Sequence, residues 1–162
     1  MIIEELYAVL ESSPKFNKNG YLSHIFATAN SELELSGNWE FGFYNSKEDV
    51  VETYAVDIDK GVLERKEGKA FKRESDKVHE LDLSKVKVDF MDALREASKF
   101  QKEKYMGQSP VRAIVVLQDL GKGPVWNVTF ITAAFNVLNI KIDAGSSQIK
   151  FHELTNLMHW KK

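Results

Sequence analysis

The sequence contains no cysteine and only three prolines in 162 residues. Without cysteine there are no disulfides, no thiolate zinc sites and no cysteine nucleophiles. There are 22 basic residues against 24 acidic ones, so the chain lacks the basic surplus typical of nucleic-acid-binding proteins. No apolar run approaches the roughly 18 residues of a membrane-spanning helix. Glu4 and Glu5 interrupt the apolar start of the chain, which is unlike a signal peptide. We therefore expect a cytoplasmic protein with no nucleic-acid or membrane partner.

An internal repeat is the strongest pattern that the sequence does contain. Hydrophobic residues make up 43% of the chain, as in ordinary folded domains. Three positions recur after 87 residues, and each tryptophan begins an alternating apolar run that predicts a half-buried strand. The repeated pairs are Gly20 and Gly107, Trp39 and Trp126, and Phe43 and Phe130.

Each half is predicted to contain one helix followed by four strands. An apolar stripe from Ile3 to Leu10 indicates the first helix, and one from Phe90 to Gln101 indicates the second, with Asp89 as its N-cap. Asp59 and Asp143 each follow a strand at an offset of 84, which predicts that the first hairpin is three residues longer than the second. The expected strands are roughly 22–35, 39–43, 54–58 and 62–71 in the first half, and 111–117, 126–130, 138–142 and 148–151 in the second.

The second half resembles the PepSY domain family. The resemblance covers a helix at 90–97, the strand Trp126-Asn127-Val128-Thr129-Phe130, and a closing segment from Ile140 through Asp143-Ala144 to Ile149. It implies an α+β fold with two cystatin-like repeats, each a helix packed on a curled antiparallel sheet. The repeats are expected at 1–74 and 86–162, with a linker at about 75–85. The resemblance also implies an inhibitory or binding role.

Residues suited to catalysis or metal binding are sparse. The four histidines, at 24, 79, 152 and 159, lack the spacing of a zinc site, so we expect no metal, no cofactor and no catalytic residues. Asp57 and Asp59 share one strand face and could hold a cation or a proton, although aspartates at such positions usually cap turns. Trp39 and Trp126 could stack on a ligand, but we favour a role in the core of each half.

A non-enzymatic module that binds a protein or peptide, as an inhibitor or regulator, is the function that the sequence favours. One alternative is a small-molecule-binding domain that uses the concave face of the sheet. A second alternative is a hydrolase or isomerase with a carboxylate site at Asp57 and Asp59. The partner of the binding module is expected to be another protein, a peptide or a second copy of the chain.

Phe135 and Ala134 are the predicted binding residues. They lie in the second hairpin tip, Ile131-Thr132-Ala133-Ala134-Phe135-Asn136, which carries no charge and lacks the residues that tight turns select. Burial of Phe135 within the chain, on the first half or on Leu154, Leu157 and Met158, is the interpretation that we slightly favour. The other is that Phe135 contacts a partner or a second subunit.

Overall fold

The structure is a computed structural model that describes residues 1–70 and 77–159. Its elements repeat the order of one helix followed by four strands. They are α1 (Ile2–Ser12), β1 (Tyr21–Asn30), β2 (Trp39–Asn45), β3 (Val50–Asp57), β4 (Gly61–Lys69), the 3-10 turn η1 (Leu83–Lys85), α2 (Phe90–Lys104), β5 (Pro110–Asp119), β6 (Pro124–Thr132), β7 (Asn136–Asp143), β8 (Ile149–Asn156) and the 3-10 turn η2 (Leu157–His159).

One antiparallel sheet contains all eight of these strands, in the order β4-β3-β2-β1-β5-β6-β7-β8. The two sets of four strands join where β1 pairs with β5, from His24 opposite Gln118 to Asn30 opposite Arg112. This pairing satisfies backbone groups that would otherwise be exposed on the inner edge of each set. The predicted fold class, two cystatin-like repeats that each pack a helix on a separate curled sheet, is therefore wrong: the protein is a continuous, strand-rich sheet with two short helices.

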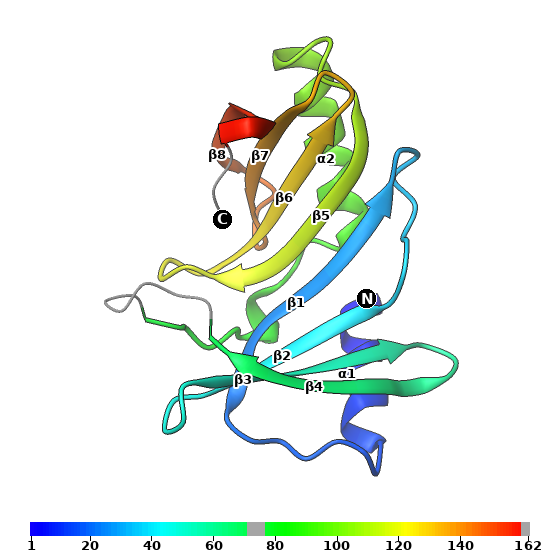
Figure 1. Cartoon of the computed structure of the whole chain (residues 1–162), viewed down its shortest axis with the longest axis vertical. Coiled ribbons are helices and arrows are strands. Elements are labelled where there is room, and N and C mark those ends of the chain that lie inside the picture. The colour runs from blue at the N-terminus through cyan, green and yellow to red at the C-terminus, as the bar shows by residue number, and fades with distance from the viewer. Residues whose placement is uncertain (71–76, 160–162) are drawn as a thin grey trace.

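Both helices lie on the same side of the sheet (Figure 1). α1 packs behind β3 and β4, and α2 packs behind β6 and β7. The stripe predicted for α2 is the face that it buries, and the Asp89 carboxylate accepts a hydrogen bond of 2.9 Å from the Phe90 amide, as expected of an N-cap. Gly107 follows the helix at a φ of 90°, a conformation that glycine adopts without strain.

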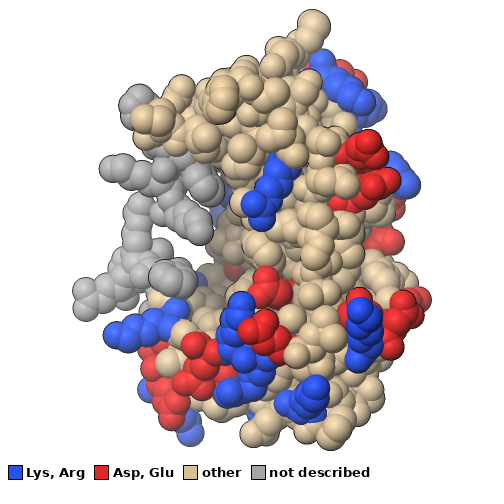
Figure 2. Space-filling view, turned by 45° about the vertical axis from the view of Figure 1, so that its right-hand side comes forward, with Lys and Arg blue, Asp and Glu red and all other residues tan. Residues whose placement is uncertain are grey.

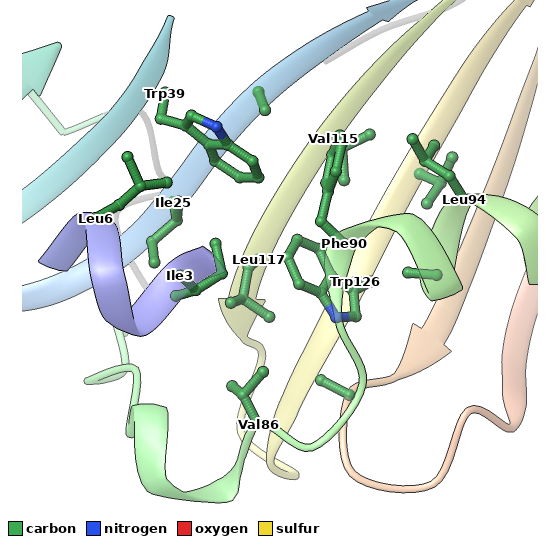
Figure 3. Close-up of a cluster of buried hydrophobic side chains, with 14 of the residues drawn as sticks. Ile3, Leu6, Ile25, Trp39, Val86, Phe90, Leu94, Val115, Leu117 and Trp126 are labelled. Atoms are coloured by element: carbon green, nitrogen blue, oxygen red, sulfur yellow. The ribbon is translucent and has the colours of Figure 1, made fainter. Parts of the chain in front are cut away.

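Phe90 joins the two halves into one core. Its ring lies between the two tryptophans, with ring centroids 4.8 Å from Trp39 and 5.9 Å from Trp126 (Figure 3). The indole NH of Trp126 donates a hydrogen bond of 2.8 Å to the Val88 carbonyl. Both tryptophans are buried, so they are core residues, as we favoured, and neither presents a free face for a ligand. They belong to one shared core rather than to one core for each half.

Strand register corrects the alignment of the repeat. Trp39 pairs with Val56, and Trp126 pairs with Ile142, so these two hairpins differ by one residue and not by three. The next residues along β3 and β7 are Asp57 and Asp143. Asp57 is therefore the counterpart of Asp143, and the predicted equivalence of Asp59 with Asp143 is wrong.

The described part of the predicted linker packs on the core. Leu81 is buried and its amide donates a hydrogen bond of 2.8 Å to the Leu22 carbonyl, and Val86 and Val88 are buried a few residues further on. Residues 75 and 76 of that linker, and the end of the predicted strand at Phe71, lie outside the described residues. The division into repeats at 1–74 and 86–162 stays a prediction.

The opposite face of the sheet has no covering layer in the described chain (Figure 1). Its central side chains come from alternate positions of β1, β5 and β6 and are mostly half-buried. They include Phe26, Ile114, Val116, Asn127 and Thr129.

Candidate binding surface

Phe135 is the last residue of the turn between β6 and β7, and 73% of it is exposed. Its φ is 61°, in the left-handed region that bulky side chains rarely occupy. The Phe135 amide donates a hydrogen bond of 3.1 Å to the Thr132 carbonyl, and the Asn136 amide donates one of 3.1 Å to Thr132 Oγ1. These hydrogen bonds hold the turn in place. Because Phe135 is largely exposed, the favoured prediction that it is buried within the chain is wrong. Its role as a contact residue, together with the exposed Ala134, stays a prediction.

The turn is fixed to its neighbours on two sides. Gln108, in the loop between α2 and β5, accepts hydrogen bonds through Oε1 from Thr132 Oγ1 at 3.0 Å and from Asn136 Nδ2 at 3.1 Å. On the other side, the Leu157 amide of η2 donates a hydrogen bond of 3.0 Å to the Phe135 carbonyl. These hydrogen bonds hold in place the backbone that carries the exposed Phe135 ring.

Two exposed methionines lie in the segments that flank this turn. Met106, in the loop between α2 and β5, is 86% exposed, and Met158 of η2 is 88% exposed. Both segments reach the same end of the molecule as the turn (Figure 1). In Figure 2 this upper end is largely uncharged, whereas charged side chains crowd the lower end. We call this surface the apolar end and define it as Met106, Ala134, Phe135, Leu157 and Met158.

The corresponding turn of the first half has ordinary turn chemistry. The Asn45 side-chain oxygen accepts hydrogen bonds from the amides of Lys47 at 3.0 Å and Glu48 at 3.4 Å. Asp49 directly precedes β3, as Phe135 precedes β7, and also has a positive φ, of 54°. Aspartate tolerates this conformation better than phenylalanine does. An exposed aromatic residue with a positive φ is therefore found in the second turn and not in the first.

Asp57 and Asp143 act as turn caps, and Asp59 takes part in the first cap through its amide. Asp57 Oδ1 accepts hydrogen bonds from the amides of Asp59 at 2.8 Å and Lys60 at 2.9 Å, and these bonds lower the pKa of Asp57. Burial raises the pKa of Asp143, but hydrogen bonds from the amides of Gly145 and Ser146 outweigh it and leave the pKa below its usual value. A carboxylate held in this way is a poor proton carrier at neutral pH.

The three histidines whose side chains are described do not converge on one site, although His24 and His79 line the same cavity. His152 Nδ1 lies 2.6 Å from the Tyr105 hydroxyl, and His24 Nδ1 lies 3.0 Å from Ser23 Oγ. Burial lowers the pKa of His24 and favours its neutral form. His159 lies in η2, and its side chain is outside the described structure. Within residues 1–70 and 77–159, no three histidine, aspartate or glutamate side chains are grouped so that they could hold a metal ion.

A cavity of about 650 Å³ opens on the uncovered side of the sheet. His24, Thr53 and Gln118 contribute polar groups from three strands, and Lys69, Lys77 and His79 add groups that carry or can carry positive charge. The cavity is open to solvent and is lined by polar and apolar groups in similar amounts, unlike the enclosed, mainly apolar pocket expected for a small-molecule site. Neither Asp57 nor Asp59 lines it.

Sequence reasoning proposed Phe135 and Ala134 as contact residues, considered Met158 only as a residue that would bury Phe135, and missed Met106. The pattern predicted that the last strand ends at Phe151, whereas β8 continues to Asn156 and brings η2 beside the turn. The signal for Met106 in the sequence was the uncharged segment Tyr105-Met106-Gly107, which directly follows the charged last turn of α2.

Comparisons with known proteins show the fold and leave the function open. No family model matches the chain, and no curated protein matches it. Among solved structures, the chain is similar to a protein described as a "putative lipoprotein" from Clostridium difficile 630, with 15% identity, a TM-score of 0.50 and coverage of 82% of each chain. At this identity the likeness supports the arrangement of strands and helices only. No helix in the described part of this chain has the length and apolar character to cross a membrane.

Proposed function

We propose that this protein is a non-enzymatic binding module that contacts another protein or a peptide through the apolar end. The observation that carries the proposal is Phe135, a bulky aromatic residue that is 73% exposed at a φ of 61°. A residue that adopts an unfavourable conformation and gains little from burial suggests a role outside the folding of the chain.

Simple energetics favours a partner that covers the Phe135 ring. A left-handed conformation costs about 1–2 kcal/mol for a residue with a side chain. Burial of a phenylalanine ring contributes about 1.5–3 kcal/mol, which is sufficient to offset that strain in a complex. The hydrogen bonds of Thr132, Asn136 and Leu157 already fix the turn, so binding orders little additional backbone.

Substitution of Phe135 by glycine tests the proposal. Glycine accepts the positive φ without strain, so Phe135→Gly removes the ring while the turn is preserved. Asp49→Gly is the control for glycine at the equivalent position of the first turn; it also removes the hydrogen bond from the Tyr44 hydroxyl, so its folding is checked in the same way. Immobilised wild-type and variant proteins are incubated with a lysate of the native host, and the retained proteins are compared by mass spectrometry.

We expect a partner that the wild type and Asp49→Gly retain and that Phe135→Gly loses. Circular dichroism and thermal melting must show that Phe135→Gly is folded. Equal retention by all three proteins contradicts the proposal, and so does the absence of any specifically retained protein.

Small-molecule binding is the second candidate, and the cavity beside His24 is the observation in its favour. Because the cavity is open and its lining is mixed, this candidate has less support than the apolar end gives the first. The hypothesis of a hydrolase or isomerase with a carboxylate site has no such support, because the amides of Asp59 and Lys60 donate hydrogen bonds to the Asp57 carboxylate. A cytoplasmic location also stays a proposal from the sequence, and the lipoprotein description belongs to the similar protein alone.

A further inference from the structure

The sheet ends at two strands that differ strongly in charge. β4 forms one end and β8 the other, and no strand of the described chain pairs with their outer sides. β4 reads Gly-Val-Leu-Glu-Arg-Lys-Glu-Gly-Lys, with five charged residues in nine. β8 reads Ile-Lys-Phe-His-Glu-Leu-Thr-Asn, with only Lys150 and Glu153 charged when its histidine is neutral. Charged side chains on an edge strand oppose pairing with another chain, so β4 is protected and β8 much less so.

β8 also exposes apolar side chains. Phe151 is 39% exposed and Leu154 is 37% exposed. Phe151 belongs to the uncovered face, because it pairs with Lys141, whereas His152 reaches the helix side and contacts the Tyr105 hydroxyl. An edge that combines unpaired backbone groups with exposed apolar side chains is suited to accept a further strand.

We propose that β8 pairs antiparallel with β8 of a second copy of this chain, with a two-fold axis that passes between the two His152 residues. Such an axis must stand perpendicular to the sheet, so each side chain keeps its face in both copies. The pairing places Phe151 of each copy opposite Glu153 of the other and extends the sheet without a break.

Charge complementarity selects this register. Lys141 Nζ lies 4.3 Å from the centre of the Phe151 ring on the uncovered face. Glu153 of the second copy would come beside that ring and near the ammonium group. Lys141 and this Glu153 lie two strands apart, on either side of Phe151, and unlike charges that meet on one face of a sheet favour strand pairing, whereas like charges disfavour it. Because of the two-fold symmetry, the dimer contains two sites at which Lys141 and Phe151 of one copy meet Glu153 of the other.

The neighbouring registers are poorer. An axis at Glu153 sets two carboxylates opposite each other, and an axis at Lys150 does the same with two ammonium groups. An axis at Phe151 pairs only residues 149–153 of β8, whereas the axis at His152 pairs residues 149–155. More backbone groups of the free edge are therefore satisfied at His152.

The absence of cysteine makes the contact directly testable. Residues directly opposite in antiparallel strands have Cα atoms about 4.5–5.5 Å apart, which is within the range of a disulfide. His152→Cys should form a disulfide-linked dimer under mild oxidation. Phe151→Cys alone should not, whereas a mixture of Phe151→Cys and Glu153→Cys should. Glu67→Cys, on the charged edge, is the matched control and should stay unlinked.

Light scattering and analytical ultracentrifugation of the unmodified protein test the same contact without a cross-link. The wild type should dimerise with rising concentration. Glu153→Lys should weaken dimerisation about tenfold by setting like charges together, and Lys141→Glu with Glu153→Lys should restore it. Phe135→Gly should dimerise as the wild type does, which separates this contact from the apolar end.

Three outcomes overturn the proposal. The first is a wild type that stays monomeric at its highest soluble concentration. The second is a disulfide-linked dimer that forms with Glu67→Cys but not with His152→Cys. The third is a dimer that Glu153→Lys leaves unchanged.

Discussion

Asp49 and Phe135 occupy the same backbone position, each the left-handed residue that directly precedes the second strand of its hairpin. The Tyr44 hydroxyl donates a hydrogen bond to Asp49 Oδ1, so that residue is fixed by local polar contacts. Phe135 is instead held by its backbone, and its ring projects into solvent. The two turns share a left-handed residue before the second strand but differ in surface chemistry.

Removing the Phe135 side chain should stabilise the isolated protein. Phe135→Gly relieves the left-handed strain and loses little burial, so we expect the free energy of unfolding to rise by about 1 kcal/mol after the added flexibility of the unfolded chain is allowed for. Phe135→Ala should show no comparable gain, because alanine keeps the strain. Urea denaturation measures both, and a clear loss of stability in Phe135→Gly would mean that the ring supports the fold.

Phe90 should support both halves at once. Phe90→Ala removes the ring that contacts Trp39 and Trp126 and should cost about 3–5 kcal/mol. Met91→Ala, at a position that is 39% exposed, is the control and should change stability by less than about 0.5 kcal/mol. Calorimetry should show a single transition for the wild type, and two separate transitions would contradict a shared core.

Gly42 should be required by its contact with His24. A Cβ atom at position 42 would lie 2.1 Å from His24 Cε1, so Gly42→Ala should destabilise the protein by about 1–3 kcal/mol. Adding His24→Ala should recover most of that loss in the double variant. Gly68→Ala is the control, because a Cβ atom at position 68 would have no described neighbour within 4 Å. Equal effects at positions 42 and 68 would be inconsistent with this contact.

His24 should make stability depend on pH as the pH falls below about 7. Burial lowers its pKa in the folded state, whereas the unfolded chain has an ordinary value near 6.5. As the pH falls below 6.5, the unfolded chain binds a proton more readily, so stability decreases until the folded pKa is passed. His24→Gln should show a flatter profile in urea denaturation over this interval. The lowered pKa values of Asp57 and Asp143 act at more acidic pH, below about 4.

Local patterns in the sequence were sufficient to identify most elements. The stripe from Phe90 to Gln101 predicted the buried face of α2, and alternation after Trp39 and Trp126 predicted β2 and β6. These signals depend on residues within one element, whose periodicity follows from the geometry of a helix or strand. The helix-on-sheet repeats inferred from them were nevertheless wrong as a fold class.

Two errors arose where the decisive contact joins distant residues. The sequence alone could not reveal that β1 pairs with β5, because backbone hydrogen bonds leave no residue-specific pattern. Repeat spacing aligned Asp59 with Asp143, whereas the pairing of Trp39 with Val56 identifies Asp57 as the counterpart. An insertion in a turn changes spacing, and only the register reveals its length.

The sequence by itself determined the two helices, most of the strands and the unusual composition of the second turn, since each follows from neighbouring side chains. The tertiary structure alone decided that eight strands form one sheet, that Phe90 unites two tryptophans in one core, and that Phe135 is exposed. Exposure and strand order depend on which distant surfaces meet when the chain folds. A turn without charge is compatible with burial or with contact to a partner, and the position of the turn at the end of the sheet excluded burial within the described chain.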